Sequence, residues 1–568
     1  MKSSRIISLG FLAALMPLLC AHPSWAVTIP GSADINRIGA AQLKREQPSF
    51  SKNKDVIQIP YIPLTGPLPP GAGKIHFQLG GVWFHNVTVF DDAELKSLYR
   101  LKFRKIVDLK FPWEVAAELT KMYRDKGYFL CRAYVPAQKI GKSGILRIEA
   151  IEGSIGSITF EGARVPNSPI ITKAVAAILT DKPTRIQTLE TQLLLLNNLP
   201  GLSFKATLAP ASQNQTDVEL ILTVTKIKPV RTVSVDNHGS RFMGPNEITA
   251  SWEGSLLPLQ KTKISYETTP NMNGPGHFYS INLTHKIALS TRLSLDLGYG
   301  HSNALPAYTL KQFNITSQSN SASIGLDYRL IRTRRENLTS HFALNYLNSS
   351  INLLNTPFNR DRIRTAQLGV DFNNADKWHG QNFLDMQITH GLPILSSTKT
   401  DDKLVSKPDV HPDFTKITLH YMRLQYLAKD WSSLLSLDGQ AASGSLYSSE
   451  EFGYGGSVVG RAYNVSEITG DEGVSASLEL HYSGLPVWYR TIFSPYAFYD
   501  IGRVWQLHPS TPPSISAASA GLGLDVKNAL GLNANIYVAK PLTKAVLTPL
   551  YGTNGKAPSY SFLLGYNF

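Results

Sequence analysis

Two short motifs near the end of the sequence contain the side chains best suited to make a specific polar contact. The first, Gly460-Arg461-Ala462-Tyr463, lies in a glycine-rich stretch in which one arginine is flanked by small residues. The second, Phe498-Tyr499-Asp500-Ile501-Gly502, follows about forty residues later. A glycine-rich loop can fold back closely, so Arg461 could reach Asp500 and form a charge-assisted pair. The alternative is that both are ordinary charges with no contact between them.

The sequence contains none of the common catalytic or phosphate-binding motifs in intact form. The sequence has no His-Glu-x-x-His, and Gly455-Gly456-Ser457-Val458-Val459 lacks the closing glycine of a nucleophile elbow. Gly141-Lys142-Ser143 resembles the end of a phosphate-binding loop, but Pro136 stands where its first glycine belongs. The 14 histidines are scattered. We therefore expect no catalytic residue, no cofactor and no metal site; a hydrolase whose acids converge from distant strands is the remaining catalytic alternative.

The start of the chain has the features of a secretory signal. A basic start at 1–5 precedes an apolar run at 6–20, and Ser24-Trp25-Ala26 supplies small residues for cleavage. The run is too short to span a membrane. Removal of residues 1–26 leaves Cys131 as the single cysteine, so we expect neither an intrachain disulfide nor a cysteine metal cage.

The composition of the chain points to a membrane protein built from strands. Its 568 residues include 42 Gly, 24 Tyr and 23 Phe with only 17% charged residues, which is unusual for a soluble enzyme. After the signal no apolar run reaches the ~18 residues of a transmembrane helix, so a crossing would require a closed barrel. The net charge of +14 could favour acidic lipopolysaccharide, an acidic partner or nucleic acid. Lys and Arg residues that line the lumen and rims of a barrel account for it better, and no basic helix with interleaved aromatics indicates nucleic-acid binding.

The first half of the mature chain is predicted to hold a helix, a linker and two similar modules. A helix is expected at 33–47 and a proline-rich linker at 60–71. Each module has the order β-α-α-β-β and is large enough for a small core. The expected elements of the first are 77–90, 91–105, 112–126, 129–135 and 145–151, and those of the second are 155–161, 168–179, 185–199, 203–208 and 217–226.

From residue 230 onward, helical periodicity gives way to strict alternation of apolar and polar residues. Clear examples are 292–301, 366–372, 474–482, 531–538 and the final segment 560–568. Long strands with one apolar and one small or polar face are typical of a membrane barrel, here of about sixteen strands. By this alternation Tyr499 and Ile501 face lipid, whereas Asp500 and Gly502 face the lumen.

The architecture and the two motifs resemble the outer-membrane transporters of two-partner secretion, the haemolysin secretion/activation family, within the barrel superfamily with polypeptide-transport-associated (POTRA) domains. In that family an inward-folding loop carries an Arg-Gly-Tyr/Phe tetrad, and an inner strand carries Phe-x-Asp-x-Gly. Arg461 with Gly460, Ala462 and Tyr463 matches the loop, with Ala462 in place of the commoner glycine. Phe498, Asp500 and Gly502 match the strand.

The likeness covers nearly the whole mature chain, including Glu-Ile-Thr-Gly-Asp at 467–471, the closing strand, and a helix at 34–47 that in this family can occupy the pore. It implies α+β periplasmic modules followed by a transmembrane antiparallel β-barrel. The implied divisions are a signal peptide at 1–26, an amino-terminal helix and linker at 27–74, POTRA domain 1 at 75–153, POTRA domain 2 at 154–228 and the barrel at 229–568.

The function implied by the resemblance is export of a large partner exoprotein through the barrel without nucleotide hydrolysis. The implied partners are an exoprotein with an amino-terminal secretion domain, outer-membrane lipid and lipopolysaccharide, and the barrel assembly machinery, but no nucleic acid. The Arg461–Asp500 pair would hold the loop in place. A barrel assembly factor and a passive porin are the alternatives; two modules rather than a longer array argue against the first, and 150 residues of modules against the second.

Overall fold

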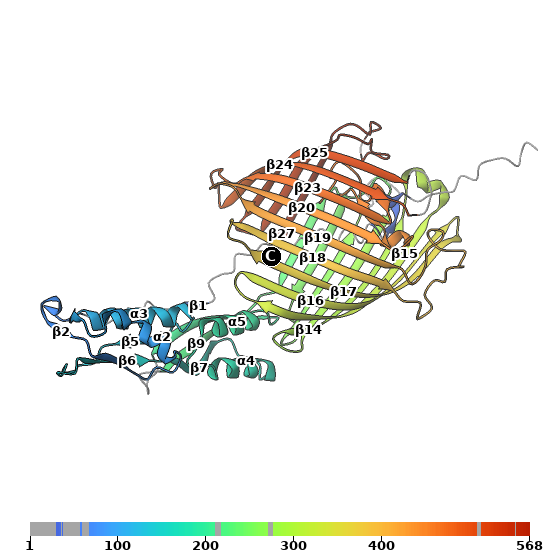
Figure 1. Ribbon diagram of the computed structural model, residues 1–568. Coiled ribbons are helices and arrows are strands. Elements are labelled where there is room, and N and C mark those ends of the chain that lie inside the picture. Colours follow the sequence, from blue (N-terminus) through green and yellow to red (C-terminus); the bar gives the residue numbers. More distant parts are fainter. Residues whose placement is uncertain are drawn as a thin grey trace, which may run out of the picture.

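The computed structural model describes residues 30–35, 37, 57–58, 68–210, 217–270, 277–507, 513–550 and 552–568. Two α/β modules lie beside one end of a closed barrel (Figure 1). The expected signal peptide lies outside the described residues, as does most of the expected linker. No described helix combines the length and the apolar character needed to cross a membrane.

The first module contains a three-stranded sheet, a two-stranded sheet and two helices over one apolar core. Its core includes the buried Leu119, Tyr123, Leu146 and Ile148. Its elements are β2 (His76–Gln78), β3 (Gly81–His85), α2 (Asp92–Ser97), β4 (Ile106–Asp108), α3 (Phe111–Asp125), β5 (Arg132–Tyr134) and β6 (Ile145–Ile151), with 3-10 turns at Ala72–Lys74 and Arg100–Lys102. The ends of α3 match expectation, with Pro112 in its first turn and Gly127 at φ 89° just past it.

Two expected elements of this module were wrong in extent. The strand expected at 77–90 is divided at Leu79 and Gly80, because β2 pairs with β4 whereas β3 pairs with β6. The helix expected at 91–105 starts as predicted, with the amide of Glu94 donating to Asp91 at 2.8 Å, but ends at Ser97. The following chain forms β4 and buries Val107 in the core, so strand pairing prevails over local helical pattern.

The second module has the predicted order of elements. Its core gathers Ile155, Ile178, Leu193, Phe204 and Leu222, all nearly inaccessible to solvent. Its elements are β7 (Ser154–Gly162), α4 (Pro169–Leu179), α5 (Ile186–Leu196), β8 (Leu202–Pro210) and β9 (Asp217–Lys226). The amide of Ile170 donates to the Ser168 side chain at the start of α4.

A short strand from the linker extends the sheet of the second module. Strand β1 (Ile57–Gln58) pairs in parallel with β8, with Ile57 opposite Ala206, and gives the order β1-β8-β9-β7. The β8 edge is therefore covered by the chain itself, and β7 is the other edge of this sheet.

The second module contacts turns at one end of the barrel. Arg334 in the turn after β15 forms an ion pair with Glu190 of α5 at 3.0 Å, and Arg332 donates to the Asn198 side chain at 2.9 Å. Leu259, in another turn on this side, packs against the core of the module. These contacts fix the module on the rim rather than leave it on a free linker.

The barrel closes with sixteen antiparallel strands, as expected. The last strand returns to the first, with Tyr566 opposite Val233, and the amide of Phe568 donates to the Arg231 carbonyl at 2.9 Å. The strands are β10 (Val230–Asp236), β11 (Glu247–Gly254), β12 (Gln260–Thr268), β13 (His277–Ala288), β14 (Leu293–Leu305), β15 (Thr316–Arg332), β16 (Glu336–Leu353), β17 (Thr356–Ala375), β18 (Gly380–Gly391), β19 (Thr415–Tyr426), β20 (Trp431–Ala442), β23 (Glu472–Tyr482), β24 (Thr491–Trp505), β25 (Ser514–Asn528), β26 (Leu532–Pro541) and β27 (Ser559–Asn567).

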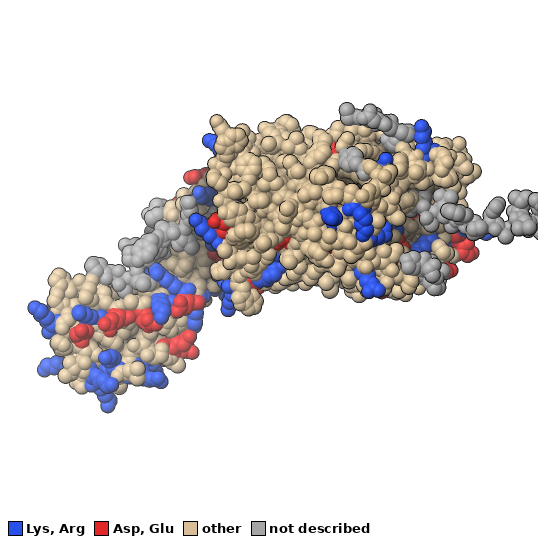
Figure 2. Space-filling model, turned by 90° about the horizontal axis from the view of Figure 1, so that it is seen from above, with Lys and Arg blue, Asp and Glu red and all other residues tan. Residues whose placement is uncertain are grey.

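The two faces of the barrel wall differ as the alternation predicts. Tyr499 and Ile501 are exposed on the outside, whereas Asp500 is completely buried within. Figure 2 shows that charged side chains are concentrated on the modules, whereas the visible face of the barrel is mostly uncharged. An uncharged outer face suits hydrocarbon contact, since a Lys or Arg at the bilayer midplane costs about 2–4 kcal/mol.

Residues 30–35 and 37, here named the amino-terminal lumen segment, lie inside the barrel near the end away from the modules (Figure 1). Ile35 is fully buried in a cluster with Phe278 and Leu310, and the Ser240 hydroxyl donates to the Ser32 carbonyl at 2.6 Å. Ile35 and Arg37 have helical backbone, which agrees with the start of the expected helix; its remainder lies outside the described residues.

Candidate functional site: a loop docked in the barrel lumen

The connection between β20 and β23, residues 443–471 and here named the lumen loop, folds into the barrel. It contains a small hairpin in which β21 (Phe452–Tyr454) pairs with β22 (Ile468–Gly470). The hairpin packs on inner side chains of the wall, among them Phe498 and Tyr537. Gly455 has φ 118° and a Cβ there would lie 2.2 Å from the Asn464 carbonyl oxygen, so the turn requires glycine.

Arg461 of the lumen loop binds Asp500 of β24 through two side-chain hydrogen bonds. Its Nε donates to Oδ2 at 3.1 Å and its Nη2 donates to Oδ1 at 2.7 Å. The main-chain amides of Gly460 and Arg461 also donate to Oδ2, each at 3.1 Å. Arg461 is 6% exposed and Asp500 is 0% exposed. The carboxylate is therefore surrounded by donors, as a buried charge must be.

Two further polar side chains and one ring complete the surroundings of the Arg461 guanidinium. Nη1 donates to Glu479 at 2.6 Å and Nη2 donates to Ser477 at 2.8 Å, both from β23. The ring of Phe498 lies against the guanidinium, with its centroid 3.6 Å from Cζ. The Ser477 hydroxyl also donates to Asp500 at 2.7 Å, which links the two strands beneath the loop.

The glycine of the strand motif, Gly502, makes room for the loop. A Cβ at Gly502 would lie 2.2 Å from the Tyr454 ring, and a Cβ at Gly460 would lie 2.8 Å from the same ring. Tyr454 is fully buried between these two glycines. A side chain at position 502 would therefore separate the loop from the wall without altering any charge.

The two remaining residues of the loop motif, Tyr463 and Ala462, form no ion pair and instead pack between the loop and the wall. Tyr463 donates to the carbonyls of Ala518 and Lys544, each at 3.0 Å. Ala462 is 5% exposed within the cluster formed by the loop and wall. A small residue therefore fits at 462, in agreement with the match to a commoner glycine.

The end of the lumen loop is held by a second polar network. Lys407 donates to Glu451, Asp471 and Gln506, each at 2.7 Å. The carboxylate of Asp471 also accepts from the amides of Leu446 and Leu507 at 2.8 and 2.9 Å. Asp471 closes the Glu-Ile-Thr-Gly-Asp stretch, so that stretch anchors the base of the loop.

The amino-terminal lumen segment joins this second network. Arg37 forms an ion pair with Glu451, and both side chains are at least nine-tenths buried. A Cβ at Gly31 would lie 2.3 Å from the carbonyl oxygen of Ser466, which shows how closely the segment approaches the loop. The segment, the loop and Lys407 therefore form one connected structure across the lumen.

The sequence alone did not reveal every residue of this site. The alternation at 474–482 predicts only that Ser477 and Glu479 lie on the polar face of a strand. The register places Ser477 opposite Asp500 and Asp500 opposite Ser519, and the Ser519 hydroxyl donates to Asp500 at 3.4 Å. The signal that could have found them is this alternation combined with a strand register, which one sequence does not supply.

Comparison with known families identifies this architecture. The model of the haemolysin secretion/activation protein family ShlB/FhaC/HecB matches residues 215–526, more than half of the chain. This chain belongs to that family. A POTRA domain of the ShlB type matches residues 77–153. The protein is thus an outer-membrane transporter of the two-partner secretion type, with its α/β modules in the periplasm.

Relatives and solved structures agree with this assignment. The heme/hemopexin transporter protein HuxB of Haemophilus influenzae (strain ATCC 51907 / DSM 11121 / KW20 / Rd) is 25% identical over 481 residues, covering 79% of this chain and 80% of HuxB. The outer membrane transporter CdiB of Dickeya dadantii (strain 3937) is 20% identical over 487 residues, covering 82% and 83%.

The fold resembles two solved structures. CdiB from Escherichia coli superimposes with a TM-score of 0.72 at 17% identity, covering 96% of this chain and all of that one. CdiB from Acinetobacter baumannii gives 0.61 at 15% identity, covering 94% and 97%. Members of the family are transporters, and neither the assembly-factor nor the porin alternative is favoured.

Proposed function

We propose that this transporter captures one large exoprotein in the periplasm and passes it, unfolded, through the barrel lumen. The likeness to HuxB and CdiB supports a dedicated exoprotein as partner. The chain itself would perform no catalytic step and hydrolyse no nucleotide, and folding of the exoprotein outside the cell would give the movement its direction.

The Arg461–Asp500 pair is the observation that carries the mechanism. It holds the lumen loop against β24, and the loop together with the amino-terminal lumen segment occupies space that the exported chain would need. The proposed role of Gly460, Arg461, Ala462, Tyr463, Phe498, Asp500 and Gly502 is therefore to position the loop. Removal of one partner of a buried pair costs about 3–5 kcal/mol because the other charge is left uncompensated.

The periplasmic modules supply the capture site. Their open sheet edges, including β7, can accept an extended segment of the exoprotein through main-chain hydrogen bonds. We divide the chain for this purpose into a signal peptide at 1–26, a helix and linker at 27–74, two POTRA domains at 75–153 and 154–228, and a barrel at 229–568.

Export in cells tests the proposal. A candidate exoprotein with an amino-terminal secretion domain is co-expressed with wild-type barrel, with Arg461→Ala and with Arg503→Ala, and the culture medium is assayed. Arg503 lies on the exposed side of the same strand as Asp500 and is the matched control. We expect export to require the barrel, to fall at least about tenfold with Arg461→Ala, and to be unchanged with Arg503→Ala at equal barrel levels. Unchanged export without the barrel would contradict the transport function itself.

Biogenesis involves two further proposed partners, the barrel assembly machinery and lipopolysaccharide. The alternating segment that ends at Phe568 supports recognition by the assembly machinery, and the net charge of +14 supports contact with acidic lipopolysaccharide. Phe568→Ala should lower the amount of folded barrel in outer membranes, with Leu547→Ala, an exposed loop residue, as control.

A further inference from the structure

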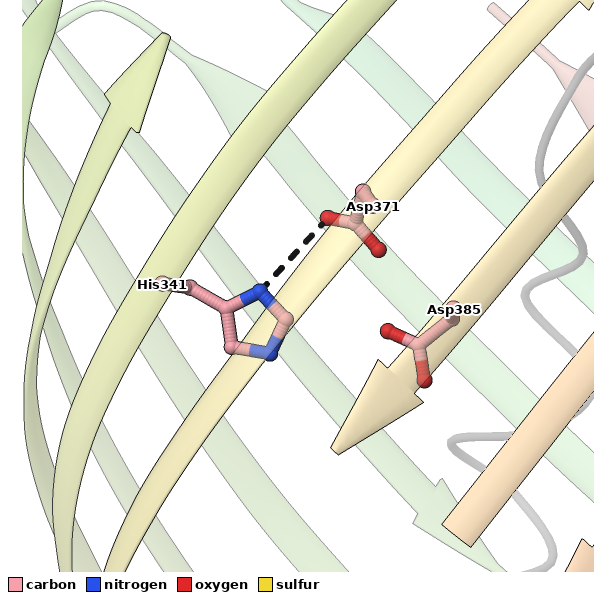
Figure 3. Close-up of side chains that lie close together, drawn as sticks. All are labelled: His341, Asp371 and Asp385. Atoms are coloured by element: carbon pink, nitrogen blue, oxygen red, sulfur yellow. Dashed lines mark ion pairs between the residues drawn. The ribbon is translucent and has the colours of Figure 1, made fainter. Parts of the chain in front are cut away.

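A histidine and two aspartates from three adjacent strands meet on the inner wall of the barrel, away from the lumen loop. They are His341 of β16, Asp371 of β17 and Asp385 of β18, and Figure 3 shows the three side chains turned toward one another. One potential ligand atom from each lies within 4.8 Å of the others. All three lie four or five residues from the periplasmic ends of their strands.

Two ionised carboxylates at these positions repel each other unless a proton or a metal cation lies between them. Asp371 lies directly opposite Asp385 in the antiparallel ladder, where like charges destabilise a pair. The ammonium of Lys286 already pairs with Asp296 at 3.0 Å and Asp327 at 2.6 Å. Within the described part of the chain, no Lys or Arg forms an ion pair with Asp371 or Asp385.

Neither ring nitrogen of His341 forms a hydrogen bond with another described residue, so either could bind a metal ion. Its Nε2 is buried and has no hydrogen-bond partner among the described residues. Its Nδ1 is 3.8 Å from Asp371 Oδ2, which is too long for a hydrogen bond. The ring lies over Gly369, where a Cβ would be 2.1 Å from Nε2, so this glycine leaves the space that the imidazole occupies.

We propose that His341, Asp371 and Asp385 bind one divalent transition-metal ion of the zinc type within the lumen. One imidazole nitrogen and two carboxylate oxygens are donors that Zn²⁺ accepts at about 2.0–2.2 Å, with water completing the coordination. Closing the three donors around one ion requires side-chain movements of about 1 Å at these spacings. The imidazole favours Zn²⁺, Co²⁺ or Ni²⁺ over Mg²⁺ and Ca²⁺, which prefer oxygen.

The ion would have two structural consequences. It would neutralise the two opposed carboxylates, and it would link β16, β17 and β18 across the lumen face. This inference also revises the expectation of no metal site, which rested on histidines scattered along the sequence. His420 lies opposite Asp385 in the ladder and its Nδ1 is 2.8 Å from Asp438, but it is not part of the group whose ligand atoms lie within 4.8 Å of one another.

Zn²⁺ titration of the full-length protein tests the site. The protein, without a polyhistidine tag and stripped with a chelator, is titrated in detergent micelles by calorimetry, first with Zn²⁺ and then with Ca²⁺. We expect one saturable Zn²⁺ per chain and weaker Ca²⁺ binding. His341→Ala, Asp371→Asn and Asp385→Asn should each weaken Zn²⁺ binding at least about tenfold. The Co²⁺-loaded wild type should show absorption bands of mixed nitrogen and oxygen coordination.

The control is His285→Ala, because the ring nitrogens of His285 contact Thr262 and Gln260 rather than a carboxylate. Its Zn²⁺ affinity should equal that of the wild type, and retained heat-modifiable migration on gels would verify that each variant is folded. Absence of saturable Zn²⁺ binding by the wild type overturns the proposal whatever the variants do. Equal affinity for Ca²⁺, or a loss confined to His420→Ala, also overturns it.

Discussion

Asp500 accepts hydrogen bonds from both the side chain and the main chain of Arg461, at 2.7 to 3.1 Å. The carboxylate therefore fixes the backbone of the lumen loop as well as the arginine head group. Since the pair is buried, it is screened little by salt. A lysine at position 461 would keep the charge but could not form the bidentate hydrogen bonds that the guanidinium makes with Asp500.

Steric displacement of the loop should have the same effect as loss of the charge pair. In Gly502→Ala, the new methyl group would overlap the Tyr454 ring, and overpacking of this kind costs about 1–3 kcal/mol. We expect reduced export and greater protease sensitivity of the lumen loop in intact cells. Gly439→Ala is the control, because a Cβ at Gly439 meets nothing within 4 Å. An undisturbed loop in Gly502→Ala would contradict the packing role of this glycine.

The ion pair between Arg37 and Glu451 should keep the amino-terminal lumen segment inside the barrel. Arg37→Ala and Glu451→Gln should each increase ion conductance through the purified barrel in planar bilayers, because the segment loses a buried contact. The double variant should conduct little more than Glu451→Gln alone, since Glu451→Gln already removes the ion pair that Arg37→Ala breaks. Fully additive increases would show that the two residues act independently.

Strand β1 should compete with the exoprotein for the edge of the second module. Replacement of residues 55–60 by Gly and Ser at constant length would remove the two β1–β8 residue pairs, worth about 1 kcal/mol together. Binding of the exoprotein's secretion domain to the transporter should tighten about fivefold, as measured by interferometry. The same replacement at 62–67 serves as control. Unchanged binding would indicate that the exoprotein uses another edge, such as β7.

The single cysteine of the first module should resist alkylation in the folded state. Burial raises the pKa of the Cys131 thiol to about 12, so it stays protonated at pH 9. Hydrophilic alkylating reagents should label it slowly in the native protein and quickly in urea. The raised pKa also means that its contribution to stability is present below pH 9 and is lost as the pH rises toward 12. Cys131→Ala should remove that part of the pH dependence.

Much of the fold follows from local patterns in the sequence. Alternation placed Asp500 inward and Tyr499 outward, and the structure confirms both. The proline and glycine that bound α3 were also correctly interpreted. These predictions succeeded because each depends on residues adjacent in sequence. The helix expected at 91–105 ends early, at Ser97, because Arg104 and Lys105 at its expected end form main-chain hydrogen bonds with Leu79 instead, a contact that local pattern does not encode.

The candidate site was less accessible to prediction. The residues alone left Arg461 and Asp500 as two charges with no established contact, and the resemblance to a family supplied their pairing. Glu479 and the cluster around His341 went unrecognised because their partners come from separate strands. Only the register of the barrel brings such positions together, and register depends on hairpin geometry along the whole sheet.

The strand added at β8 has a mechanical consequence. Arg37 is bound inside the barrel and Ile57 is paired at the second module, so two attachment points lie only twenty positions apart in the sequence. If an exoprotein segment replaced β1, the second attachment would be lost, and the amino-terminal lumen segment would be connected to the modules through a longer stretch of chain. Occupation of this sheet edge in the periplasm would then change, through chain length alone, how firmly the amino-terminal lumen segment is held at the other end of the barrel.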